Sequence, residues 1–385
     1  MKSTISTQMR KCLIDLARFD LALDESIKGE LLELQDDEWP QLFQLASAHR
    51  VLANLSRVVA NMVEAPPLSI SAARRQLILF KRQAAMRKYE SESAIEVLRN
   101  KGVKVVALKG LVLGIECYPE FYLRETGDLD ILIDLSELLV ATDALLAEGF
   151  TRSQTVPGTG NLEEISVARL DGYASELQHV GEFTKLAANG SMLTIDIHYR
   201  LSTIFDHLSP RTDFFLNNTI VSSDLNFFQF RPELFVSHLG YHAWWDTQSL
   251  TNVRSGLDLR LFQYSDILLA FKRWNLTCSE VIRWSEQAGT LETSNWALWL
   301  TSRIFGSLPG DGVIDVDAAE KFDKRFSDRW IQRSTVEPLG EWGKLAFERI
   351  FDLTRGDQAT AMITNWIDGH TKKGDILEWV IRENM

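Results

Sequence analysis

The sequence has few cysteines and no long apolar segment. Its three cysteines, Cys12, Cys117 and Cys278, are scattered, odd in number and without metal-ligand spacing, which favours a reducing compartment. The N-terminus lacks the apolar region of a signal peptide, and no uninterrupted apolar run is long enough to span a bilayer. We therefore expect a cytoplasmic protein that has no membrane partner.

The sequence also has fewer basic than acidic residues. It contains 41 Lys and Arg and 53 Asp and Glu, which gives a net charge of −12. Broad nucleic-acid binding needs basic surface that displaces counterions, so this charge balance disfavours it. One local stretch is nevertheless basic, a predicted helix that begins at Ser69 or Ser71 and ends at Lys101-Gly102. It is either a solvated helix face or a surface that steers phosphates, and its cations are Arg74, Arg75, Lys81, Arg82, Arg87 and Lys88.

The chain of 385 residues can bury a sizeable core, and its patterns divide it into three regions. Residues 1–100 have apolar residues at helical spacing, notably from Ile5 to Leu23 and from Trp39 to Val63. Residues 101–201 alternate short strands with helices, and residues 202–385 are again largely helical. We predict an α+β protein with a small mixed-sheet core between N-terminal and C-terminal helical lobes. The last third of the chain shows no recognisable chemistry.

The core region opens with two strands and a turn. A β-branched run from Val103 to Ala107 predicts a strand, which Lys109-Gly110 breaks, and residues 111–117 predict a helix. A second strand is expected from Asp128 to Ile133. Period-2 alternation puts Asp128 and Asp130 together on the strand face opposite its aliphatic residues.

Two carboxylates on one strand face require an explanation. At about 5 Å and an effective dielectric of about 20 they repel by about 3 kcal/mol. A strand with an aliphatic opposite face does not lie wholly in water, so this cost is not screened away. A divalent cation relieves the repulsion, and oxygen ligands suit Mg²⁺ or Mn²⁺.

This order of strand, glycine turn, helix and Asp-x-Asp strand resembles the nucleotidyltransferase superfamily, which includes DNA polymerase beta and the aminoglycoside nucleotidyltransferases. The resemblance is carried by Lys109-Gly110 and by the run Gly127-Asp128-Leu129-Asp130-Ile131-Leu132-Ile133. The chain is similar to a poorly characterised bacterial branch with a Leu-Lys-Gly turn and an Arg before the Asp-x-Asp, here Arg124. It departs from the commoner Gly-Ser turn, so a serine contact to phosphate is missing.

A later strand, from Met192 to Tyr199, follows the hairpin signal Asn189-Gly190 and places Asp196 and His198 on one face. The superfamily has a third acidic residue on a neighbouring strand, and the resembled branch has it in an acidic-x-His pattern. The resemblance therefore implies Asp196 as a metal ligand and His198 as a nucleotide-binding residue. The residues alone leave open that Asp196 pairs with a nearby cation and that His198 hydrogen bonds to the scaffold.

His238 and His242 lie four residues apart in a helix predicted from Glu233 to Trp245. The residue after His238 is not the glutamate that a zincin needs, and no other His or Cys cluster completes a zinc site. The resembled branch has histidines here and an aspartate in the next helix, matched by Asp266. The resemblance thus implies that these three residues contact nucleotide or acceptor.

The resemblance implies transfer of an NMP from an NTP to a hydroxyl-bearing acceptor, with release of pyrophosphate. A small-molecule acceptor is favoured, because the acidic balance disfavours tRNA; a protein side chain stays open. The implied catalytic and metal-binding residues are Asp128, Asp130 and Asp196, with Mg²⁺ or Mn²⁺ as cofactor. The implied nucleotide-binding residues are Lys109, Gly110, Arg124, His198, His238, His242 and Asp266.

Three other interpretations compete with an active enzyme. The chain could be a catalytically silent nucleotide-binding module, or a protein-partner module such as the nucleotidyltransferase half of a toxin–antitoxin pair. It could also be an unrelated α/β protein with a chance motif. Retention of all three carboxylates favours activity, whereas a silent module would bind nucleotide without turnover or bind only a protein.

Overall fold

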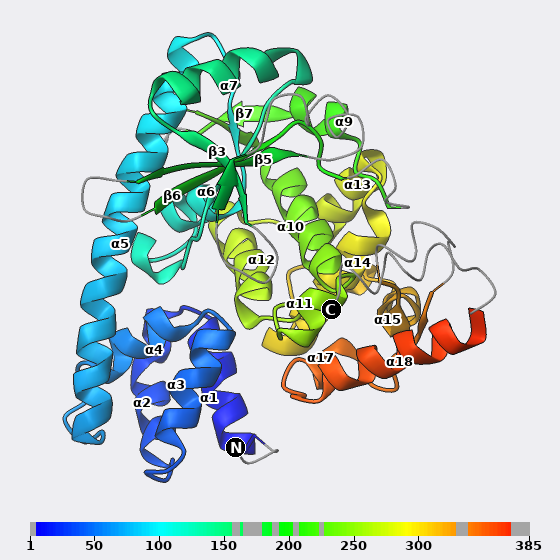
Figure 1. The fold of residues 1–385 in the computed structure, drawn as a ribbon. Coiled ribbons are helices and arrows are strands. Elements are labelled where there is room, and N and C mark those ends of the chain that lie inside the picture. Colours follow the sequence, from blue (N-terminus) through cyan, green and yellow to red (C-terminus); the bar gives the residue numbers. More distant parts are fainter. Residues whose placement is uncertain are drawn as a thin grey trace. The chain divides into compact units, whose positions relative to one another are not determined.

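The structure, a computed structural model, describes residues 5–155, 162–164, 179–186, 192–202, 208–222, 227–328 and 338–370. Many helices accompany one large mixed sheet (Figure 1), which confirms the predicted α+β class. The chain divides into two compact units. The helical unit comprises Met1–Leu77, Val236–Glu286 and Thr290–Met385, and the sheet unit comprises Ile78–Phe235 and Gln287–Gly289. The three regions that the sequence indicates, 1–100, 101–201 and 202–385, stay a prediction.

Within the described residues, eight strands form the sheet, in the order β4-β3-β5-β6-β2-β1-β8-β7. β2 pairs in parallel with β6 and β1 pairs in parallel with β8, while the other neighbours are antiparallel. The strands are β1 (Val106–Ala107), β2 (Leu129–Leu132), β3 (Thr151–Thr155), β4 (Leu162–Glu164), β5 (His179–Leu186), β6 (Met192–His198), β7 (Thr219–Val221) and β8 (Phe228–Phe230). The helices with residues in this unit are α5 (Pro67–Asn100), α6 (Lys109–Glu116), η2 (Phe121–Leu123), η3 (Leu135–Glu137), α7 (Leu138–Ala147) and α9 (Thr212–Asn217), together with the first residues of α10 (Pro232–Asp246) and the last of α13 (Cys278–Ala288).

The central strands of this sheet form its core. Leu129, Ile131 and Ile133 are buried, as the alternation predicts, and so are Ile195 and Ile197 of β6. All four residues of β2 are buried, which is typical of a strand that is covered on both faces. A carboxylate carried by β2 is therefore held largely out of water.

Local boundaries differ from the sequence prediction where proline and backbone conformation decide them. α5 begins at Pro67, so Ser69 and Ser71 lie inside the helix; proline suits a first helical position because its fixed φ is already helical. The stretch from Trp39 to Val63 forms two helices, since Arg50 between them has a φ of 53°. The predicted turn at Asn189-Gly190 lies outside the described residues, although β5 and β6 pair antiparallel on either side of it.

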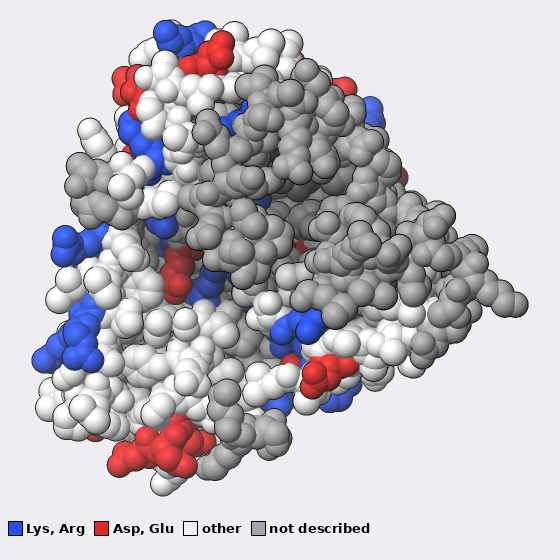
Figure 2. All heavy atoms as spheres, in the orientation of Figure 1, with Lys and Arg blue, Asp and Glu red and all other residues white. Residues whose placement is uncertain are grey.

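The long helix α5 presents its basic residues mainly to solvent. Arg74, Arg75, Lys81 and Arg82 are exposed, and Figure 2 shows Lys and Arg side chains along the edge where α5 lies in Figure 1. Arg87 differs from them because it is partly buried. A solvated face accounts for the exposed cations, and steering of phosphates by this helix stays a prediction.

The helical unit contains most of the remaining elements. Its helix α10 begins at Pro232, one residue before the predicted start, and proline suits a first helical position. Its helices are α1 (Thr7–Ala17), η1 (Leu21–Leu23), α2 (Asp24–Leu32), α3 (Trp39–Ala48), α4 (Leu52–Val59), α10 (Pro232–Asp246), α11 (Leu250–Arg254), α12 (Leu261–Trp274), α13 (Cys278–Ala288), α14 (Leu291–Phe305), η5 (Asp311–Val313), α15 (Val316–Lys324), α17 (Ala346–Arg349) and α18 (Arg355–His370). The short strands β9 (Arg325–Phe326) and β10 (Gly340–Glu341) pair antiparallel.

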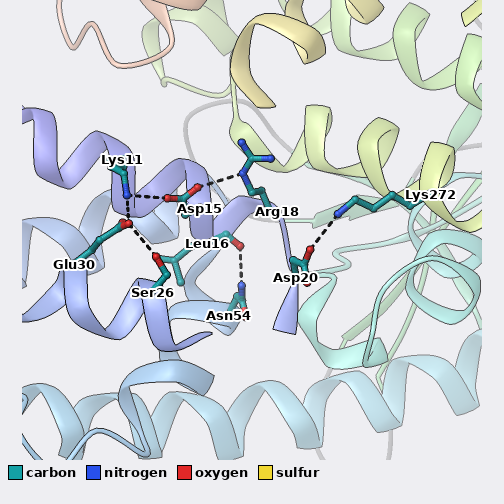
Figure 3. A network of polar contacts seen from close by, with 9 residues as sticks. All are labelled: Lys11, Asp15, Leu16, Arg18, Asp20, Ser26, Glu30, Asn54 and Lys272. Carbon is teal, nitrogen blue, oxygen red and sulfur yellow. Dashed lines mark hydrogen bonds and ion pairs between the residues drawn. The ribbon is translucent and has the colours of Figure 1, made fainter. Parts of the chain in front are cut away.

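Polar contacts tie the first helices of this unit together (Figure 3). The amide of Asn54 on α4 donates to the Leu16 carbonyl of α1 at 2.7 Å, and Asn54 is buried. Around it Lys11 contacts Glu30, and Lys272 of α12 lies 3.5 Å from Asp20. The exposed ion pairs contribute little, so the buried amide bond is the contact here that matters most for stability.

A buried ion pair joins α15 to α17. Arg349 Nη2 lies 3.3 Å from Asp323 Oδ1, and the two side chains are only 3% and 1% exposed. Asp323 also accepts hydrogen bonds from Trp296 Nε1 at 2.8 Å and from the Ala346 N–H at 2.6 Å. Burial lowers the pKa of Arg349, and the negative charge of Asp323 opposes that shift. Each partner therefore depends on the other to remain charged inside the unit.

We expect Arg349→Met to lower the free energy of unfolding by about 3–5 kcal/mol, because it leaves the Asp323 carboxylate buried without a cation. Urea denaturation followed by tryptophan fluorescence measures this. Lys344→Met is the control, since it breaks the ion pair with Asp352, in which Lys344 is 55% exposed; a loss of at most about 1 kcal/mol is expected there. Equal losses in the two variants would contradict this interpretation.

His49 makes the helical unit sensitive to acid. Burial, aided by the charges of Arg355 and Arg260, lowers the pKa of His49 to about 3. As the pH falls below about 6.5, the unfolded chain takes up a proton that the folded chain refuses, so stability is lost. We expect wild type to lose about 3 kcal/mol more unfolding free energy than His49→Gln between pH 6.5 and 4. Urea denaturation across this range measures the difference, and parallel profiles would rule the effect out.

Candidate functional site

Parallel pairing of β2 with β6 brings the predicted acidic residues together. Asp130 lies opposite Asp196, and Leu132 lies opposite His198, two residues further along β6. Directly paired residues point to the same face of a sheet, so Asp130, Asp196 and His198 share one face. One ligand atom from each of these residues lies within 4.8 Å of the others. We call these three residues the acid–histidine cluster; its donor atoms are close enough to hold one metal ion.

Of the two carboxylates in the cluster, Asp130 has the more contacts with side chains that can balance its negative charge. It is buried, with Lys109 Nζ 3.2 Å from its Oδ2 and His198 Nε2 3.0 Å from its Oδ1. Lys109 reaches it from a turn where its φ is 41°, a conformation that non-glycine residues rarely adopt. The backbone of the same turn is fixed to β2, because the Leu108 N–H donates to the Asp130 carbonyl at 3.0 Å.

Within the described residues, Asp196 has the least complete set of hydrogen bonds in the acid–histidine cluster. Its Oδ1 is buried and has no hydrogen-bond partner among the residues that the structure describes. Burial raises the pKa of Asp196 to about 7; nearby negative charges add to the shift, and His198 opposes it. Buried polar atoms are normally paired, so an orphaned oxygen beside a second carboxylate and an imidazole is a donor set that fits a divalent cation.

Asp128 lies at the margin of this arrangement. It is exposed, precedes β2, and is not a member of the acid–histidine cluster. Its charge nevertheless raises the pKa of Asp196, so the two carboxylates interact. Arg87 of α5 donates through Nη1 to the Gly127 carbonyl. Burial lowers the pKa of Arg87, and the negative charge of Asp128 opposes that shift. The predicted role of Asp128 as a metal ligand stays a prediction.

Glu182 is a further carboxylate near the cluster, and no motif in the sequence indicates it. It lies on β5 directly opposite Asp196, so it shares the face of the acid–histidine cluster. Burial and the charge of Asp128 raise the pKa of Glu182. The available signal was an acidic residue in the strand before that of Asp196, but a sequence does not give the pairing register.

Gly110 has a packing reason for its identity. A Cβ at this position would lie 2.7 Å from Thr126 Cγ2, so only glycine lets the start of α6 approach the segment before Asp128. The N-cap of α6 is Leu108, which makes no side-chain hydrogen bond to the first turn. A helix N-terminus that lacks a side-chain cap attracts anions. Binding of nucleotide at Gly110 stays a prediction.

The other predicted nucleotide-binding residues are placed as follows. Arg124 is buried and donates through Nη1 to the Glu125 carbonyl at 2.6 Å. His238, His242 and Asp266 belong to the helical unit, where His238 and Asp266 are buried. His242 Nδ1 lies 3.7 Å from Asp246 Oδ2. Contact of these four residues with nucleotide or acceptor stays a prediction.

Mixed sheet, glycine turn and strand-borne carboxylates together have the arrangement expected of the nucleotidyltransferase class. A family model described as uncharacterised nucleotidyltransferase matches residues 35–306, so the chain belongs to this family. The resemblance indicated by the motifs is thereby confirmed. No curated protein and no solved structure matches the sequence. Among the described residues, no helix is long and apolar enough to cross a membrane.

We expect Gly110→Ala to lower the free energy of unfolding by about 1–3 kcal/mol, because the added methyl group overpacks the contact with Thr126. Adding Thr126→Ser removes Cγ2 and should restore most of that loss. Gly127→Ala is the matched control, since an added Cβ there meets nothing within 4 Å. Thermal and urea denaturation of the four proteins measures these effects. A loss that Thr126→Ser does not repair would show that another contact is responsible.

Proposed function

We propose that this protein is a metal-dependent nucleotidyltransferase that moves an NMP from an NTP to a hydroxyl-bearing acceptor and releases pyrophosphate. The observation that carries the proposal is the register of β2 and β6, which sets Asp130 beside Asp196 and His198 in a member of a nucleotidyltransferase family. Oxygen-rich donors suit Mg²⁺ or Mn²⁺.

Asp130 and Asp196 would hold the cation, with Asp128 as a further ligand from the segment before β2. A bound cation would neutralise phosphate charge and lower the pKa of the acceptor hydroxyl. The contacts of Asp130 with Lys109 and His198 support this assignment, because they orient the carboxylate before any ligand arrives. The orphaned oxygen of Asp196 supports it as well, since a cation would supply the missing partner.

Lys109 and the first turn of α6 would receive the phosphates. The side chain of Lys109 already lies beside Asp130, and the helix N-terminus that follows has no side-chain cap. Cationic and backbone N–H donors of this kind stabilise the charge that develops on a leaving pyrophosphate. Phosphoryl chemistry needs mainly position and charge compensation, which these groups provide. The left-handed backbone of Lys109 fits this role, because strained residues concentrate at functional sites.

The acceptor is best sought among small molecules. The net charge of −12 disfavours a polyanionic acceptor such as tRNA. The carboxylates that gather at the acid–histidine cluster add local negative charge, which would repel a second polyanion once the triphosphate is bound. A neutral or cationic hydroxyl-bearing compound meets neither obstacle.

We expect the protein to bind at least one of the four NTPs in a Mg²⁺-dependent manner, and Asp130→Asn to weaken that binding at least about tenfold, or about 1.4 kcal/mol. The physical reason is that Asp130 loses its charge toward the cation and its ion pair with Lys109. Isothermal titration calorimetry with and without Mg²⁺ measures the affinity. Asp143→Asn, which removes an exposed carboxylate of α7, should leave it unchanged. Equal binding without metal and in Asp130→Asn would place the nucleotide elsewhere and overturn the proposal.

A further inference from the structure

We propose that Glu182 is a fourth carboxylate of this site and binds the divalent cation on the side of Asp196 that faces away from Asp130, directly or through a cation-bound water. This inference rests on the function proposed above and adds a residue to it. Three observations support it: the strand register, an irregularity in that register, and the distribution of side-chain contacts along the row of carboxylates.

The register places three acidic residues in one row. Asp130 is opposite Asp196 across the parallel pair, and Asp196 is opposite Glu182 across the antiparallel pair. Neighbouring strands lie about 4.8 Å apart, so consecutive members of the row are within reach of one ion, with Asp196 in the middle. Paired residues point to the same face, which gives Glu182 the orientation of the acid–histidine cluster.

An irregularity of β5 creates this row. His179 is paired with His198, whereas from Glu182 onward the pairing is shifted by one residue. If the first register continued, Gly181 would lie opposite Asp196, and Glu182 would lie opposite Ile195 on the other face of the sheet. Such bulges re-aim side chains and are frequent next to active sites. Here the shift brings a carboxylate to a face that already carries two.

Among the described residues, side-chain hydrogen bonds and ion pairs are found at only one end of the row. Asp130 contacts Lys109 and His198, whereas within the described residues Glu182 makes no hydrogen bond and no ion pair. Asp196 has an orphaned oxygen in the same part of the chain. Negative charge therefore accumulates between Asp196 and Glu182, where a divalent cation would gain the most.

The geometry of the row has an electrostatic consequence, because Asp130, Asp196 and Glu182 gather at neighbouring positions on one face of the sheet. Without a cation, this gathering of carboxylates costs stability, because like charges repel strongly where water is partly excluded.

The test is a titration with Mn²⁺, followed by electron paramagnetic resonance, in the presence of all four NTPs as non-hydrolysable analogues. We expect Glu182→Gln to weaken Mn²⁺ binding about 10- to 100-fold. Glu182→Asp, which keeps the charge but shortens the side chain, should fall between wild type and Glu182→Gln. Glu148→Gln is the matched control; it removes an exposed glutamate of the same unit and should bind Mn²⁺ as wild type does.

A second readout separates a ligand from a structural residue. Without metal, Glu182→Gln should melt at the same or a higher temperature than wild type, because it relieves repulsion; the rise in melting temperature that Mn²⁺ produces should shrink. Unchanged Mn²⁺ affinity in Glu182→Gln, or a metal-free variant that is less stable than wild type, would overturn the role of Glu182 alone. Absence of Mn²⁺ binding to wild type would overturn it together with the proposed function.

Discussion

The parallel hydrogen bonding of β2 with β6 is the interaction on which the site depends. It brings Asp130 and His198, which are 68 residues apart in the chain, to a contact of 3.0 Å. Because β2 is buried on both faces, this contact forms where water is scarce and electrostatic interactions are strong. A shift of this pairing by one residue would turn the β6 side chains to the other face and dismantle the cluster.

Charge is compensated unevenly around that pairing. Lys109 and His198 hold Asp130, and Arg87 lies beside Gly127 and Asp128, whereas Asp196 is left with an unpartnered oxygen in the described part of the chain. Carboxylates that lie close together without a protein cation between them repel one another, and this repulsion lowers the stability of the fold. That cost is understandable where a bound cation completes the set, as the proposed reaction requires.

The surroundings of the site fix its geometry from two directions. Gly110 allows α6 to start against Thr126, which sets the position of the segment that leads into Asp128. The start of α6 holds Lys109 beside Asp130, and the Leu108 N–H that precedes it ties the backbone to β2. The candidate site is therefore built on packed elements rather than on loops, and such support would hold reacting groups in place.

Local patterns in the sequence were enough for the α+β class and for the shared face of Asp196 and His198. They placed Asp128 on the same strand as Asp130, whereas β2 begins at Leu129 and the exposed Asp128 precedes it. Helix starts were less certain, because a proline at position 67 and the left-handed backbone of Arg50 decided them. Strand pairing is different in kind, since it joins segments far apart in the chain and its register is set by the packed sheet. Only the tertiary structure could therefore decide that His198 contacts Asp130, that Asp128 stands at the margin, and that Glu182 faces Asp196.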